Sequence, residues 1–198
     1  MRVTSIAAAL SMALAGCLAP VWTIPPYQSS LYNPDVLQEA AGSDGQVLTV
    51  IHGNPFGQPG TAFQVTTLNA LYDNHFGEAV EFTTAPNNDE DYRLILLFNQ
   101  AFLSGTNQSL CRHEGPVANG GVTGGIYVQA AFCVSHRTVS LVQGHADRIA
   151  GPDDPQFRAF MGQILAELFP RRPQDPGPND PRRLGALPQD EPKPTPSG

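Results

Sequence analysis

Two cysteines and two histidines offer the most specific chemistry in this chain of 198 residues. One residue separates Cys111 from His113, and two residues separate Cys133 from His136. Two thiolates and two imidazoles are an accepted tetrahedral zinc set, so these side chains could bind zinc if the two pairs meet. However, Cys-x-His is a cramped chelate, and paired cysteines in an oxidising compartment form disulfides. We therefore expect a Cys111–Cys133 disulfide and keep the zinc site as the alternative.

The N-terminus indicates which compartment the chain enters. Arg2 precedes an almost unbroken run of small and apolar residues over 3–15, and the run ends in Leu14-Ala15-Gly16-Cys17. Such a run is too short to span a bilayer and is typical of a secretory signal. The leucine, the two small residues and the cysteine resemble the lipobox of bacterial lipoproteins.

The lipobox resemblance implies that residues 1–16 are a signal peptide and that Cys17 becomes the acylated N-terminus, with palmitate-type chains. Two or more acyl chains are enough for stable membrane anchoring. Leu18 stands where an inner-membrane retention signal would carry Asp. The resemblance therefore implies the outer membrane, with the folded part in the periplasm. The alternative is an ordinary secretory signal with a chance cysteine.

Other signatures of catalysis are missing from the sequence. It contains no G-x-S-x-G, no phosphate-binding loop and no H-E-x-x-H, and its only lysine is Lys193. The net charge of −7 excludes a nucleic-acid binder, which needs a basic face. Loop histidines at positions 52, 113 and 145 could serve a hydrolase or a metal-dependent enzyme, although polar residues gather at element ends for structural reasons too. We predict no cofactor.

Hydrophobic periodicity predicts the elements that must position these residues. Short apolar runs rich in β-branched residues predict strands, over 47–51, 80–83, 92–98, 126–134 and 138–145. Apolar positions at helical spacing predict the long helices, over 61–75 and 153–169, while Asn33-Pro34-Asp35 predicts the start of a short helix over 34–41. Residues 99–124 are expected to be irregular, since they are rich in glycine.

These elements predict a single α+β domain over residues 44–169. We expect a two-layer sandwich, in which one mixed or antiparallel sheet of about four to five strands carries two main helices on one face. Residues 17–43 are assigned to the lipidated N-terminus, an extended tether over 18–32 and the short helix. Aromatic residues of the tether, such as Trp22, can pack on the domain or lie at the lipid interface, and we favour packing.

Residues 170–198 are predicted to be a disordered, proline-rich tail, because they offer too little apolar area to offset the entropy of ordering. The whole chain is then expected to be an envelope lipoprotein that acts as a non-enzymatic binding or structural module. Its expected partners are the membrane, through the lipid on Cys17, and another envelope protein. The alternatives are the histidine-based enzyme above and a small-ligand binding lipoprotein of a transport system.

Overall fold

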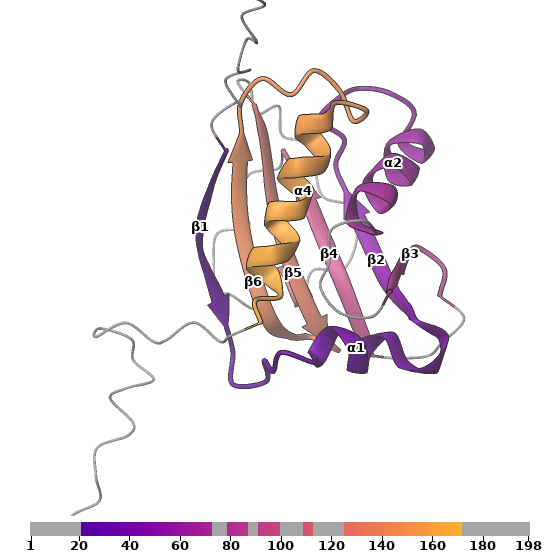
Figure 1. Cartoon of the computed structure of the whole chain (residues 1–198), viewed down its shortest axis with the longest axis vertical. Helices are drawn as coiled ribbons and strands as arrows, with labels where there is room; N and C mark the ends of the chain where they lie inside the picture. Colours follow the sequence, from indigo (N-terminus) through magenta and orange to yellow (C-terminus); the bar gives the residue numbers. More distant parts are fainter. Residues whose placement is uncertain (1–20, 73–78, 87–90, 100–108, 113–124, 172–198) are drawn as a thin grey trace, which may run out of the picture.

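One mixed sheet organises the protein in its computed structural model (Figure 1). The structure describes residues 21–72, 79–86, 91–99, 109–112 and 125–171. Within these ranges the sheet has six strands in the order β1-β6-β5-β4-β2-β3. They are β1 (Val21–Gln28), β2 (Gln46–His52), β3 (Glu81–Thr83), β4 (Tyr92–Phe98), β5 (Ile126–Val134) and β6 (Arg137–Ala146). Strand β2 pairs in parallel with β3 and β4, and the remaining pairs are antiparallel.

The helices are α1 (Val36–Ala41), followed by a 3-10 turn (Gly42–Asp44), then α2 (Gly60–Tyr72), α3 (Ser109–Arg112) and α4 (Pro155–Leu168). Helices α2 and α4 both pack toward β4. Ring centroids of Phe63 in α2 and Phe157 in α4 lie 5.1 and 6.2 Å from that of Phe98 in β4. Every helix in the described ranges is too short or too polar to cross a bilayer.

Strand β4 is apolar almost throughout because it is buried on both faces of the sheet. Its side chains alternate between two clusters. Leu94, Leu96 and Phe98 join the larger core that contains the buried side chains of α2 and α4. Ile95 and Leu97 face the other way, toward α3. We call this second side of the sheet the outer face.

The extended tether predicted over residues 18–32 is wrong for residues 21–28, which form strand β1. Val21 pairs with Ala146 and Gln28 with Ser140, so β1 runs along most of β6. The register shifts by one residue between Ile24 and Tyr27, where Pro25 and Pro26 stand. Proline has no N–H to donate and is tolerated at bulges and sheet edges, and β1 offers both. The predicted four to five strands therefore become six.

The other strand predictions are confirmed, with ends that differ by at most one residue. Parallel and antiparallel pairs coexist, which confirms the mixed sheet. The end of the helix predicted over 61–75 lies outside the described residues. Most of the irregular segment predicted over 99–124 lies outside them too, and α3 is the helix described within it. Of the predicted tail, only Pro170 and Arg171 belong to the described part of the chain.

The start of α4 follows its sequence signals. Asp154 caps the helix by accepting a hydrogen bond from the backbone N–H of Gln156, and Pro155 occupies the first turn. Backbone hydrogen bonds from Ala150 and Gln156 lower the pKa of the Asp154 carboxyl. The short helix begins at Val36, two residues later than predicted, so Asn33 is not its N-cap residue. The Asn33 side chain instead accepts a hydrogen bond from the N–H of Asp35 in a local turn.

The far end of α4 is fastened to the segment that follows β1. The hydroxyl of Tyr32 donates a hydrogen bond to the carbonyl oxygen of Pro170 at 2.6 Å. Burial of this phenol raises its pKa to about 12. The contact places the end of α4 near the end of β1, whereas β1 begins beside the last residue of β6.

Helix α4 approaches β6 closely at Gly144. A Cβ on this residue would lie 2.5 Å from Cδ1 of Ile164 and 3.0 Å from the ring of Phe160. Replacing glycine here forces two fully buried side chains of α4 to move.

We expect Gly144→Ala to lower the free energy of unfolding by about 1–3 kcal/mol, the usual cost of overpacking a core. Urea denaturation measures the change. Gly60→Ala is the matched control, because a Cβ at Gly60 meets nothing within 4 Å. Equal stability of the two variants would contradict the close approach of α4.

Candidate functional site

Three ring side chains form a row across the outer face, at the end of the sheet where β1 begins. Trp22 of β1 is registered with His145 of β6, and His145 is registered with Tyr127 of β5. Registered neighbours point to the same face of a sheet. We call these three residues the aromatic–histidine row.

His145 lies between the two aromatic rings. Its ring centroid is 4.0 Å from that of Tyr127 and 5.1 Å from that of Trp22. Trp22 also meets Tyr127 edge-on, at 6.4 Å between centroids. His145 is 6 % exposed, whereas Trp22 is 45 % exposed. The row therefore covers the histidine and presents the indole to the outside.

Asp147 supports the imidazole from the loop that follows β6. Its Oδ1 lies 3.2 Å from Nε2 of His145, a contact that is an ion pair when the imidazole is protonated. Among the described residues, neither Nδ1 nor Nε2 of His145 has a partner that meets hydrogen-bond geometry. A carboxylate beside an imidazole is also part of catalytic triads. Here, however, both imidazole nitrogens are buried, and the rings of Trp22 and Tyr127 pack on the imidazole. We therefore assign His145 a structural role, in which it supports the indole of Trp22.

Gly125 leaves the space that His145 needs. It has a φ of +143°, and a Cβ there would lie 2.5 Å from Nε2 of His145 and 2.9 Å from the carbonyl oxygen of Ala146. Asn99, just after β4, holds the adjoining backbone: its Oδ1 accepts from the N–H of Tyr127, and its Nδ2 donates to the carbonyl of Gly125. These contacts fix the start of β5 and with it one end of the row.

A second row on the same face lies two residues further along the strands. It contains Ile24, Gln143, Gln129, Leu97 and His52. Ile24 is 44 % exposed, and Gln129 is buried. Ile24 therefore extends the exposed apolar surface of Trp22 along the edge strand, while His52 lies across the sheet on β2.

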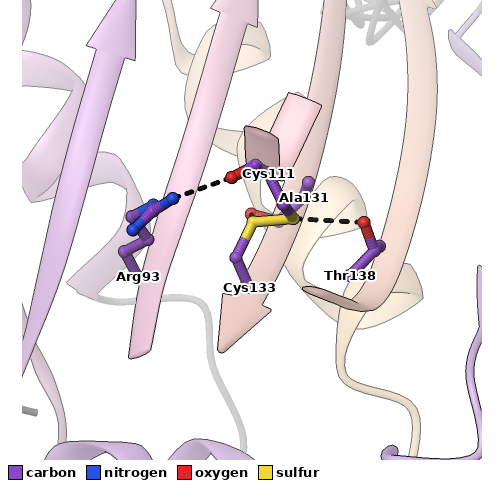
Figure 2. The surroundings of a disulfide bond; sticks show 5 residues. All are labelled: Arg93, Cys111, Ala131, Cys133 and Thr138. Atoms are coloured by element: carbon purple, nitrogen blue, oxygen red, sulfur yellow. Dashed lines mark hydrogen bonds between the residues drawn. A yellow bond between two sulfur atoms is a disulfide. The ribbon is translucent and has the colours of Figure 1, made fainter. Parts of the chain in front are cut away.

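The predicted disulfide is confirmed. Cys111 of α3 and Cys133 of β5 are joined by an S–S bond of 2.01 Å, and both residues are fully buried (Figure 2). Nη2 of Arg93 donates to the carbonyl oxygen of Cys111 at 2.8 Å, and the Thr138 hydroxyl donates to its Sγ at 3.1 Å. The bond and its two polar contacts fasten α3 to the outer face.

The zinc alternative is wrong, because both thiols are consumed in the disulfide. His136 lies exposed in the turn between β5 and β6, and His113 lies outside the described residues. Within the described ranges, no three His, Cys, Asp or Glu side chains gather in a way that could hold a metal ion.

The remaining predicted site residues are not brought together. His52 and His145 lie on different strands, and Cys17 falls outside the described part of the chain. Sequence reasoning did not single out Tyr127 or Gly125 as members of a site. Two signals were available, the lone tryptophan of the chain and the last glycine before a strand. However, only the register of β1, β6 and β5 shows that Trp22, His145 and Tyr127 are neighbours.

Comparisons with known proteins give a limited result. A scan of protein-family models finds no match for this chain, and neither does a search of curated proteins. Among solved structures, the chain is similar to the PelC dodecamer from Paraburkholderia phytofirmans, with 12 % identity over 77 % of this chain and 100 % of that chain, at a TM-score of 0.42. The PelC L103M dodecamer of the same organism gives 13 % identity over 76 % and 97 %, at 0.39. Likeness of this degree carries no argument about function.

We expect Gly125→Ala to destabilise the protein by about 1–3 kcal/mol and to change the emission of Trp22, because the new Cβ displaces His145. Trp22 is the only tryptophan, so its fluorescence reports on the row directly. Gly57→Ala is the matched control, since Gly57 also has a positive φ but a Cβ there meets nothing within 4 Å. Identical emission of the two variants would show that Gly125 does not support the row.

We expect the double variant Cys111→Ala/Cys133→Ala to lose about 3 kcal/mol of stability, since the bond closes a loop of 22 residues in the unfolded chain. Denaturant unfolding of the oxidised protein and the variant measures the difference. Substituting both cysteines avoids a free thiol in the variant. An unchanged midpoint would contradict a stabilising role of the disulfide.

Proposed function

We propose that this chain is a lipid-anchored protein of the bacterial envelope, whose folded part acts as a non-enzymatic binding or structural module facing the periplasm. Cys17 is the acylated residue, and Leu18 favours the outer membrane. The partner classes are the membrane, through the lipid, and another envelope protein.

The buried disulfide is the observation that carries the proposal. Disulfides persist in oxidising compartments such as the periplasm and are rare in the bacterial cytosol. Cys111 and Cys133 are bonded and fully buried, which fits a chain made for export. The Leu14-Ala15-Gly16-Cys17 sequence after a short apolar run supports the same destination and adds the lipid.

The contacts of His145 support a binding or structural role over catalysis. A general base must reach the proton that it removes. The nitrogens of His145 are buried, and its ring packs between Trp22 and Tyr127. The side chain that the arrangement presents to the surroundings is the indole of Trp22, which suits contact with a partner surface.

We expect the mature protein, expressed as the full chain in a bacterial host, to begin at Cys17 and to carry acyl mass on that residue. Mass spectrometry of the N-terminal peptide measures both properties. Fractionation of the membranes is expected to recover the protein with the outer membrane.

Cys17→Ser is the control for this experiment, because it removes the acceptor thiol and leaves the described fold untouched. The variant should keep residues 1–16 and lack acyl mass. A wild-type protein that is cut at another position, or that carries no lipid, would refute the proposed function.

A further inference from the structure

We propose that Trp22 and Ile24, which we call the β1 apolar surface, dock on the membrane that holds the lipid anchor. This inference rests on the proposed function, since it needs acylation of Cys17. Docking of the β1 apolar surface adds a second membrane contact beyond the acyl chains. It also orients the sheet with the start of β1 against the lipid headgroups.

The β1 apolar surface is both exposed and held in place. Trp22 and Ile24 are 45 % and 44 % exposed, two of the four large hydrophobic side chains that the described residues leave exposed. They stand two positions apart on one strand and therefore point to the same side. Trp22 packs at one side on His145 and Tyr127, so little side-chain entropy remains to be lost when the indole meets a partner.

The length of chain before β1 keeps this surface near the membrane. Four residues lie between Cys17 and Trp22, so five residue steps join them. Even fully extended, this segment spans at most about 18 Å. That length is about half the thickness of a bilayer with its headgroups, so a lipid on Cys17 confines the indole to the vicinity of the headgroup layer.

The charge pattern suits an interface that must give up water. No charged side chain occurs between Arg2 and Asp35, so β1 itself contributes no ion that docking would desolvate. Tryptophan and tyrosine are enriched at membrane interfaces, because the ring is apolar and its edge is polar. Asp147, the acid nearest to the row, is directed at Nε2 of His145. The contact is therefore expected on uncharged as well as anionic lipids.

The outer edge of β1 is poorly suited to pairing with a strand of a partner protein. In the described fold β1 pairs only with β6 and stands at the edge of the sheet. Pro25 and Pro26 interrupt the N–H donors of this edge, and the register shifts beside them. Prolines and bulges at edge strands block strand addition. A membrane contacts side chains rather than the backbone edge, so it is compatible with both features.

The single tryptophan provides the test. The mature acylated protein is placed in phosphatidylcholine vesicles, with and without bromine atoms on the acyl chains near the headgroups. Bromine quenches an indole only at close range. We expect the Trp22 emission to shift to shorter wavelength and to fall about two-fold in brominated vesicles, as for an interfacial tryptophan.

The matched control moves the tryptophan to the opposite side of the sheet. Trp22→Phe/Tyr72→Trp places it on α2, at a residue that is 50 % exposed and belongs to the half of the fold beside β3. Its emission should not depend on bromine. Unquenched Trp22 in a protein whose Cys17 carries acyl mass would overturn the docking inference alone, and so would equal quenching of the two tryptophans. Absence of acyl mass would overturn the proposed function and the docking inference together.

Discussion

Burial of strand β4 on both faces is the constraint on which the rest of the structure depends. A strand as apolar as residues 92–98 can be stable only if both sides of the sheet are covered. On one side, α2 and α4 provide the cover. There Phe56, Phe63 and Phe157 make edge or tilted ring contacts with one another or with Phe98. On the outer face, α3 must be held against the sheet, and the disulfide of Cys111 holds it there.

The two faces of the sheet are covered in different ways. The helix face depends on close packing, which Gly144 permits by admitting Ile164 and Phe160 of α4. The outer face depends on a covalent bond and on cross-strand pairs, because a helix of four residues contributes little area. Toward the start of β1, the aromatic–histidine row covers the outer face in the described part of the chain, and it leaves the indole of Trp22 45 % exposed.

Elements with strong local patterns could be predicted from the sequence. The stripe of α4 is complete, with every predicted apolar position buried, and β4, β5 and β6 follow their apolar runs. The disulfide could be predicted because two cysteines remained once Cys17 was assigned to lipid. By contrast, β1 was missed because two adjacent prolines argue against a strand unless a bulge at a sheet edge admits them. The aromatic–histidine row depends on the register of three strands, which no local pattern determines.

The pairing of β1 with β6 also has a kinetic consequence. Val21 meets Ala146, about 125 residues later in the chain, so this contact has a large sequence separation and is expected to form late. The first strand of the described fold must therefore wait until almost the whole chain has been synthesised. During that interval its apolar side chains have no native partner, and such exposed strands are prone to aggregate. Pro25 and Pro26 lower this risk in the unfolded chain as well, since proline cannot extend a growing sheet.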